Sequence, residues 1–210
     1  MAKLSKLNYK AIKYFLIITL IGLITTSCSK DNLTEPEAPP QSAKVHTIYN
    51  IPADTANQNK STYFRFKDST IVTGPDTATA NWDIAFNKTI IFTNSGSSGP
   101  GKGGAIVLRN VNFEDVIEAP ETGYDIDSTS APAIPSGSDK GWYHYSGPPN
   151  HLITPIPGVV LIIRCGNGKY AKVQILSYYK NAPQNPTGKE PSRFYSFKYF
   201  YQDDGSRNLK

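Results

Sequence analysis

The chain has 210 residues, with 22 Lys and Arg against 17 Asp and Glu, which gives a formal net charge of +5. Four of the basic residues lie among the first 27 positions, which contain no acid, so 18 basic and 17 acidic residues remain in the rest of the chain. A segment so close to neutral has no basic field for a nucleic acid, and we therefore expect no nucleic-acid partner.

The first 27 residues have the pattern of an export signal. Lysines are followed by the apolar run "YFLIITLIGLITTS", about fourteen residues that end directly before Cys28. Such a run is too short to span a membrane and is typical of a signal peptide. Thr25-Thr26-Ser27-Cys28 is similar to the lipobox of bacterial lipoproteins, although Thr25 replaces the usual aliphatic residue. We expect residues 1–27 to be a lipoprotein signal peptide and Cys28 to be acylated, for example with palmitate; ordinary secretory cleavage is the alternative.

Composition also divides the rest of the chain. Residues 28–43 are rich in proline and polar residues, which predicts an extended tether rather than a core. Residues 44–210 are long enough for one domain with a substantial core. Cys165 has no second cysteine in this domain, so we expect a buried, inert thiol and no disulfide.

Period-two alternation predicts an all-β domain. We expect strands at 44–49, 62–67, 80–92, 104–110, 141–145, 158–165, 169–179 and 192–202, separated by segments rich in Gly, Pro and Asn. Within 169–179, Ala171, Val173, Ile175 and Tyr179 share one face, and Lys172 and Gln174 share the other. Within 192–202, an aromatic row occupies Tyr195, Phe197, Tyr199 and Tyr201. At most one short helix is expected, around 113–119, where β-branched residues make the helix weak.

The glycine-rich stretch 96–103, "GSSGPGKG", satisfies part of the nucleotide-binding P-loop pattern. Gly103, however, stands where a Ser or Thr hydroxyl should bind magnesium, and the following residues are β-branched rather than helical. A P-loop needs a helix whose N-terminal amides hold the phosphates. We therefore expect these glycines to let the chain turn and pass close to other backbone between two strands, with nucleotide binding as the minor alternative.

Several separated stretches together resemble the HmuY family, lipid-anchored haem-binding proteins of Gram-negative outer membranes. They are Trp82-Asp83-Ile84-Ala85, Gly99 to Ala105, Gly141-Trp142, Ala171 to Gln174, and Phe197 to Tyr201. The resemblance implies a single hand-like antiparallel β domain over residues 44–210 that grips haem at one end. It further implies an anchor in the outer membrane at the cell surface, or release from it, and transfer of haem to a TonB-dependent receptor in iron acquisition.

The resemblance also implies iron ligands, which family members supply as a pair of histidines or a pair of methionines. Aligned on the shared motifs, the second ligand falls at Gly147, and the only methionine is Met1. The nearest substitutes are His151 first and His144 second, because neutral imidazole is a good ligand for haem iron. One axial ligand is more plausible than two, and the alternative is that both are surface residues with no metal. His46 is expected to be exposed.

Aromatic residues near these histidines offer a second kind of contact. Trp142, Tyr143 and Tyr145 could stack on a porphyrin, and tyrosinate can also bind ferric iron, although packing between strands is the simpler role for each. The sequence contains no G-x-S-x-G, H-E-x-x-H or cysteine cluster, so we expect no enzyme. The alternative to haem is a module of the same fold that recognises a glycan, a peptide or a partner protein.

Overall fold

The computed structural model describes residues 44–210, which fall in one compact unit. The predicted signal peptide (1–27), the tether (28–43) and the lipidation of Cys28 therefore lie outside the described residues. Within 44–210, no helix is long and apolar enough to cross a membrane.

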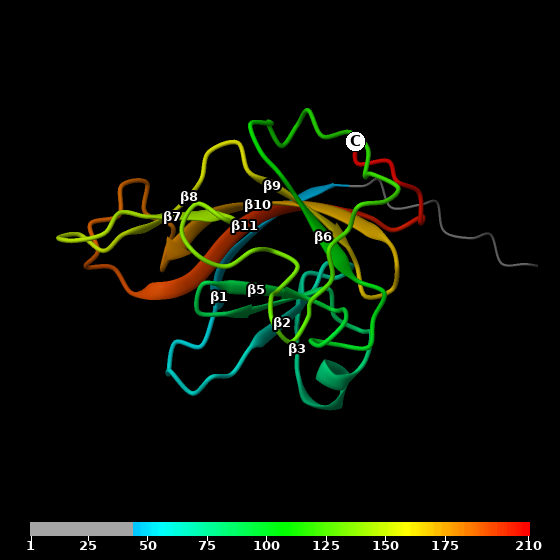
Figure 1. Ribbon diagram of the computed structural model, residues 1–210, viewed down its shortest axis with the longest axis horizontal. Helices are drawn as coiled ribbons and strands as arrows, with labels where there is room; N and C mark the ends of the chain where they lie inside the picture. Colours follow the sequence, from blue (N-terminus) through cyan, green and yellow to red (C-terminus); the bar gives the residue numbers. More distant parts are fainter. Residues whose placement is uncertain (1–43) are drawn as a thin grey trace, which may run out of the picture. The chain divides into compact units, whose positions relative to one another are not determined.

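The fold consists of antiparallel β-strands, which confirms the expected all-β domain (Figure 1). The five-stranded sheet has the order β1 (Val45–Pro52), β11 (Ser192–Gln202), β10 (Tyr170–Tyr179), β9 (Val160–Arg164) and β6 (Gly104–Leu108). The four-stranded sheet has the order β3 (Thr70–Val72), β2 (Thr62–Arg65), β4 (Ile84–Asn87) and β5 (Ile90–Thr93). β7 (Tyr143–Tyr145) pairs with β8 (Ile153–Pro155), and among the described residues the one helical turn is the 3₁₀ segment η1 (Gly74–Ala78).

The two larger sheets pack face to face through aromatic rings. The predicted row on β11 supplies Tyr195, Phe197 and Tyr199, all fully buried. The Phe64 ring lies 5.3 Å from that of Phe197, and the Phe86 ring lies 4.5 Å from that of Tyr195. Burying such a side chain contributes roughly 1.5–3 kcal/mol relative to exposure, so this row is a main source of stability.

The other face of the five-stranded sheet is also covered, which the strand pattern did not predict. Lys172 lies on the face opposite Val173, as predicted, but it is only 4% exposed. Its Nζ donates to the carbonyls of Phe113 and Val116 at 2.9 and 2.8 Å and lies 4.5 Å from the Phe113 ring. The segment after β6 thus forms a lid over this face, held by one buried ammonium group.

The expectation of at most one short helix is confirmed, because residues 113–115 form a turn and the segment 113–119 contains no helix. Two of its carbonyls accept from Lys172 instead of joining a helical ladder. One predicted strand was wrong. The predicted strand 80–92 is the β4–β5 hairpin, with Asn87 paired to Ile90 across a two-residue turn. Lys88 in this turn has a φ of 52°, a left-handed conformation that lysine rarely adopts, so the sequence carried little turn signal.

The glycine-rich loop wraps around one buried side chain, Asn94. Its Nδ2 donates to the carbonyls of Thr79 and Trp82, both at 2.9 Å, and its Oδ1 accepts from the Gly101 amide at 2.9 Å. A Cβ added at Gly99 would lie 2.2 Å from Asn94 Oδ1. The chain continues into β6 and not into a helix, which confirms close backbone approach as the reason for these glycines.

Candidate functional site

A cleft of about 340 Å³ lies where three segments meet: the β4–β5 turn, the end of the β7–β8 ribbon, and the loop between β10 and β11. In Figure 1 the β7–β8 ribbon and the β10–β11 loop project together at one end of the domain. The lining residues that matter below are Lys88, His151, Tyr178, Tyr179, Glu190 and Arg193.

The β4–β5 turn on one side of this cleft is held from within the core. Tyr195 Oη donates to the carbonyl of Lys88 at 3.0 Å, and Trp142 Nε1 donates to the carbonyl of Thr89 at 2.9 Å. Both donor side chains are almost fully buried. Burial raises the pKa of Tyr195 well above its ordinary value, so this hydroxyl stays a donor at physiological pH. The turn is therefore a fixed surface of the cleft.

His151 lines the cleft and pairs with Tyr145. The His151 amide donates to the Gly147 carbonyl at 2.9 Å, in a turn that contains the cis Pro148–Pro149 bond. His151 Nδ1 is hydrogen-bonded to Tyr145 Oη, and the two rings stack with centroids 5.9 Å apart. This contact occupies Nδ1, which leaves Nε2 as the ring nitrogen that can bind a ligand.

His144 points to a different place. It alternates with Tyr143 and Tyr145 along β7, so its side chain lies on the opposite face of that strand. Its Nδ1 is 2.9 Å from Asp139 Oδ1, and its side chain is 53% exposed. The Ser138 hydroxyl and then His144 lower the pKa of Asp139. The structure thus does not bring His144 and His151 to one site. His46 is exposed, as expected.

Of the aromatic residues predicted to stack on a ligand, the structure exposes one. Tyr145 is 39% exposed, whereas Trp142 and Tyr143 are buried, and Trp142 packs among the rings of Tyr143, Tyr178 and Tyr195. The cleft's own aromatic residues, Tyr178 and Tyr179, were missed by the sequence reasoning. Their position at the end of a long strand, before a loop rich in Pro and Asn, was the available signal. Burial raises the pKa of Tyr178 to about 12.

The donor atoms at this cleft suit a metal that brings most of its own ligands. Within residues 44–210, no group of three or more His, Cys, Asp or Glu side chains is arranged to hold a metal ion. His151 supplies one imidazole at the cleft, and its hydrogen-bond partner Tyr145 supplies a phenol beside it. A porphyrin iron already has four ring nitrogens and needs only one or two axial ligands, so the residues present fit haem better than a free ion.

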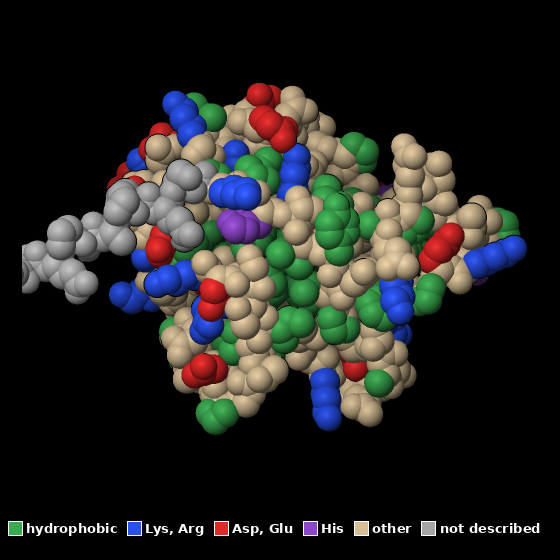
Figure 2. Space-filling model, turned by 180° about the vertical axis from the view of Figure 1, so that it is seen from behind, with side chains coloured by type: hydrophobic (Ala, Val, Ile, Leu, Met, Phe, Trp, Pro, Cys, Tyr) green, Lys and Arg blue, Asp and Glu red, His purple; other side chains and the backbone are tan. Residues whose placement is uncertain are grey.

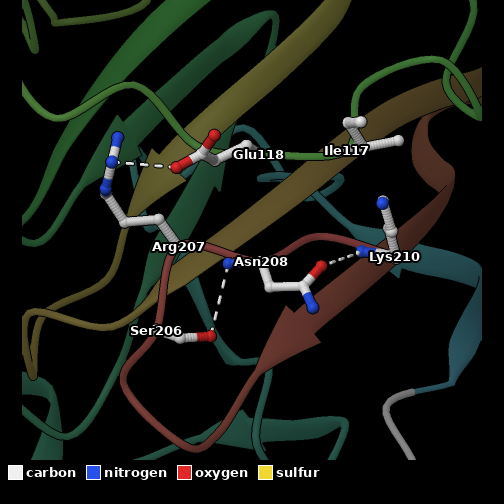
Figure 3. A pocket seen from close by; sticks show the side chains of 6 residues that line it. All are labelled: Ile117, Glu118, Ser206, Arg207, Asn208 and Lys210. Atoms are coloured by element: carbon white, nitrogen blue, oxygen red, sulfur yellow. Dashed lines mark hydrogen bonds and ion pairs between the residues drawn. The ribbon is translucent and has the colours of Figure 1, made fainter.

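A second hollow, of about 370 Å³, lies between Ile117-Glu118 and the segment 206–210 (Figure 3). Its polar groups are satisfied by one another: Arg207 Nη2 lies 2.8 Å from Glu118 Oε1, and the Lys210 amide donates to Asn208 Oδ1 at 3.0 Å. No aromatic ring lines it. It therefore lacks the walls that a flat apolar ligand requires.

The surface carries both charges. Figure 2 shows hydrophobic side chains gathered across the middle of one face, with Lys and Arg interspersed among Asp and Glu around them. Large apolar side chains are exposed at several positions of the described domain, among them Tyr49 at 60% and Leu176 at 41%.

Comparison with known proteins identifies the family. The model of the family described as HmuY protein matches residues 57–199, from the loop after β1 into β11. The chain belongs to the HmuY family. No curated protein sequence matches this HmuY-family chain.

Solved structures share the fold of this HmuY-family chain at low identity. A candidate HmuY-like haem-binding protein of Bacteroides vulgatus is 18% identical, with a TM-score of 0.51, covering 79% of this chain and 96% of its own. A candidate lipoprotein of Bacteroides fragilis is 16% identical, with a TM-score of 0.51, over 78% and 94%. Apo PinO of Porphyromonas gingivitis is 16% identical, with a TM-score of 0.51, over 77% and 99%. At these identities the likeness concerns the fold alone.

Proposed function

We propose that this chain binds haem in the cleft between the β4–β5 turn and the two projecting loops, with His151 Nε2 as an axial ligand of the iron. The observation that carries the proposal is His151, which lines the cleft and is hydrogen-bonded to Tyr145. When His151 Nδ1–H donates to Tyr145 Oη, the ring is held in place and Nε2 carries no proton, so that this nitrogen can ligate. Membership of the HmuY family and the haem-binding description of one structural neighbour support it.

The rest of the cleft offers one fixed side and several polar groups. The β4–β5 turn is held from the core, and Tyr178 and Tyr179 also line the cleft, although they are only 3% and 4% exposed. A few placed polar groups set the orientation of a bound ligand. Bound haem would supply a redox-active iron, while the protein holds the plate and shields it from water.

In the cell, we propose a carrier and not an enzyme. It would be anchored through Cys28 in the outer membrane, at the cell surface or released from it, and would pass haem to a TonB-dependent receptor during iron acquisition. The signal-like N-terminus and the family support this placement.

Titration of the purified protein with ferric haem, followed by absorption spectroscopy, tests the proposal. We expect a saturable shift of the haem bands, and a loss of affinity of tenfold or more with an altered spectrum for His151→Ala, which corresponds to about 1.4 kcal/mol or more. His46→Ala, at an exposed histidine that lines no part of the cleft, is the matched control. No saturable spectral change would end the haem proposal. Loss in His144→Ala with retention in His151→Ala would move the ligand to His144, the second candidate.

A second function has one observation in its favour. The cleft holds a single histidine, whereas exposed Tyr49 and Leu176 offer apolar surface elsewhere. If haem does not bind, we propose a module of this fold that recognises a glycan, a peptide or a partner protein. Substituting Tyr49 by Ser would then weaken capture of that partner without changing the melting temperature.

A further inference from the structure

The buried residue Asp54 contacts two cationic residues that line the cleft, Lys88 through its carboxylate and Arg193 through its backbone carbonyl. The Asp54 side chain is 1% exposed. Its Oδ1 accepts from the amides of Gln58 and Lys60 at 2.7 and 3.3 Å. Its Oδ2 is buried without a hydrogen-bond partner and lies 3.8 Å from Lys88 Nζ. A buried carboxylate oxygen without a hydrogen-bond donor destabilises the folded state, so the position of Lys88 beside it calls for an explanation.

Arg193 is hydrogen-bonded to the backbone of Asp54. Its Nη1 donates to the backbone carbonyl of Asp54 at 2.9 Å and to Asn57 Oδ1 at 3.3 Å. These contacts use one of the three guanidinium nitrogens and fix the plane of the group. Arg193 and Lys88 both line the cleft.

Backbone pairing brings these residues together from three distant parts of the chain. The Ala53 amide donates to the Arg193 carbonyl at 2.9 Å, and the Ala53 carbonyl accepts from the Lys88 amide at 3.1 Å. Since main-chain hydrogen bonds set this placement, the backbones of Lys88 and Arg193 are fixed at the wall of the cleft.

The cleft carries two cationic side chains beside two acidic ones. Lys88 lies near the buried carboxylate of Asp54, whereas Arg193 contacts the backbone carbonyl of that residue. Glu190 also lines the cleft, but its carboxylate is engaged within its own turn, by the Thr187 and Gly188 amides at 2.9 and 3.1 Å and by the Thr187 hydroxyl at 3.0 Å. The four charges balance, but neither carboxylate forms a hydrogen bond with Lys88 or Arg193, so both cations keep donor groups for a ligand.

We infer that Lys88 and Arg193 form a seat for the carboxylate groups of the ligand, with Asp54 as the positioning residue, through its carboxylate for Lys88 and through its backbone carbonyl for Arg193. This inference rests on the proposed haem function, because haem carries two propionate carboxylates at one edge of its plate. Arg binds a carboxylate through its planar fork, and Lys acts as a mobile point charge. The Lys88 side chain is 43% exposed, and 3.8 Å is too long for a hydrogen bond, so its ammonium group can turn from Asp54 to a ligand.

The simpler role for these cations is to offset the buried Asp54 and nothing more. The two roles differ in what the ligand must carry. A seat for carboxylates discriminates between haem and its dimethyl ester, which has the same iron and ring but no negative charge at the edge. A purely structural pair does not discriminate.

The test measures the affinity of the protein for haem and for haem dimethyl ester, in the wild type and in Lys88→Gln and Arg193→Gln. We expect the wild type to bind the ester at least tenfold more weakly than haem. Each variant should lose about five- to tenfold in haem affinity, with unchanged band positions and little change for the ester. Lys140→Gln, at an exposed lysine away from the cleft, is the matched control and should behave as the wild type.

Each outcome separates the carboxylate seat from the proposed haem binding. Haem and ester bound equally well, or variants that weaken both to the same extent, would overturn the carboxylate seat while leaving haem binding intact. No saturable haem binding would overturn the proposed function and the seat with it. Because Arg193 also ties down the Asp54 loop, Arg193→Lys separates folding from charge: it should fold and recover most of the affinity that Arg193→Gln loses.

Discussion

Asp83 is a buried acid whose protonation we expect to stabilise the fold. It is 3% exposed, and it links two parts of the domain: its Oδ2 accepts from the Phe66 amide at 2.7 Å and its Oδ1 from the Gly166 amide at 3.3 Å. Burial raises its pKa to about 6 from 3.8, although the two amides and the Cys165 thiol favour the charged form and oppose this change.

The sign and size of the effect follow from this shift in pKa. Because the pKa of Asp83 is higher in the folded state, its protonation stabilises that state. The contribution is fully present below pH 3.8 and is lost as pH rises through 6. A shift of about 2 units corresponds to about 3 kcal/mol in total, of which about 1 kcal/mol develops between pH 7 and pH 5. Exposed acids such as Asp68, whose pKa is lowered by Arg65, act with the opposite sign and at lower pH.

Urea unfolding of the wild type and Asp83→Asn at pH 5, 6 and 7 measures this directly. The variant should be less stable throughout, because one amide group cannot accept from both backbone donors. The wild-type advantage should grow by about 1 kcal/mol from pH 7 to pH 5, since subtracting the variant cancels the other titrating groups. Glu121→Gln, at an exposed acid, should show no such trend. A difference that stays constant across these pH values would mean that Asp83 remains charged and that the reasoning is wrong.

Two further substitutions test the packing. Gly99→Ala should lower the free energy of unfolding by roughly 2–4 kcal/mol, because the new methyl group would lie 2.2 Å from Asn94 Oδ1; thermal melting measures it, and a melting temperature within 1 °C of the wild type would contradict the close approach. Lys172→Met should cost roughly 2–4 kcal/mol and increase hydrogen exchange in the lid after β6, since two buried carbonyls lose their donor. Unchanged exchange there would show that the ammonium group does not hold the lid.

The strand pattern predicted much of the fold, for a physical reason. β11 has the predicted bounds, 192–202, because alternation of side chains across a sheet is a local property that the sequence records. The three-residue strands β3 and β8 are too short to show it. The burial of Lys172 depends on a distant segment that covers it, so no pattern along its own strand could reveal it.

The sequence predicted one part of the candidate site and missed another. His151 was named as the first ligand candidate and Tyr145 as an aromatic contact, and the structure places them together. Lys88 and Arg193 were not identified, because they belong to separate segments and become neighbours through the backbone bonds of Ala53. Such groupings arise from the pairing of strands and leave no spacing motif.

The β4–β5 turn, secured by hydroxyl and indole donors from the core, gives the cleft two sides of different rigidity. The turn is held by hydrogen bonds from buried side chains of the core, so it cannot move unless those bonds break. The opposite wall consists of two surface loops, in which exchanges of residues are cheap. Substitutions in the loops can therefore reshape this cleft during evolution, while the anchored turn keeps its place.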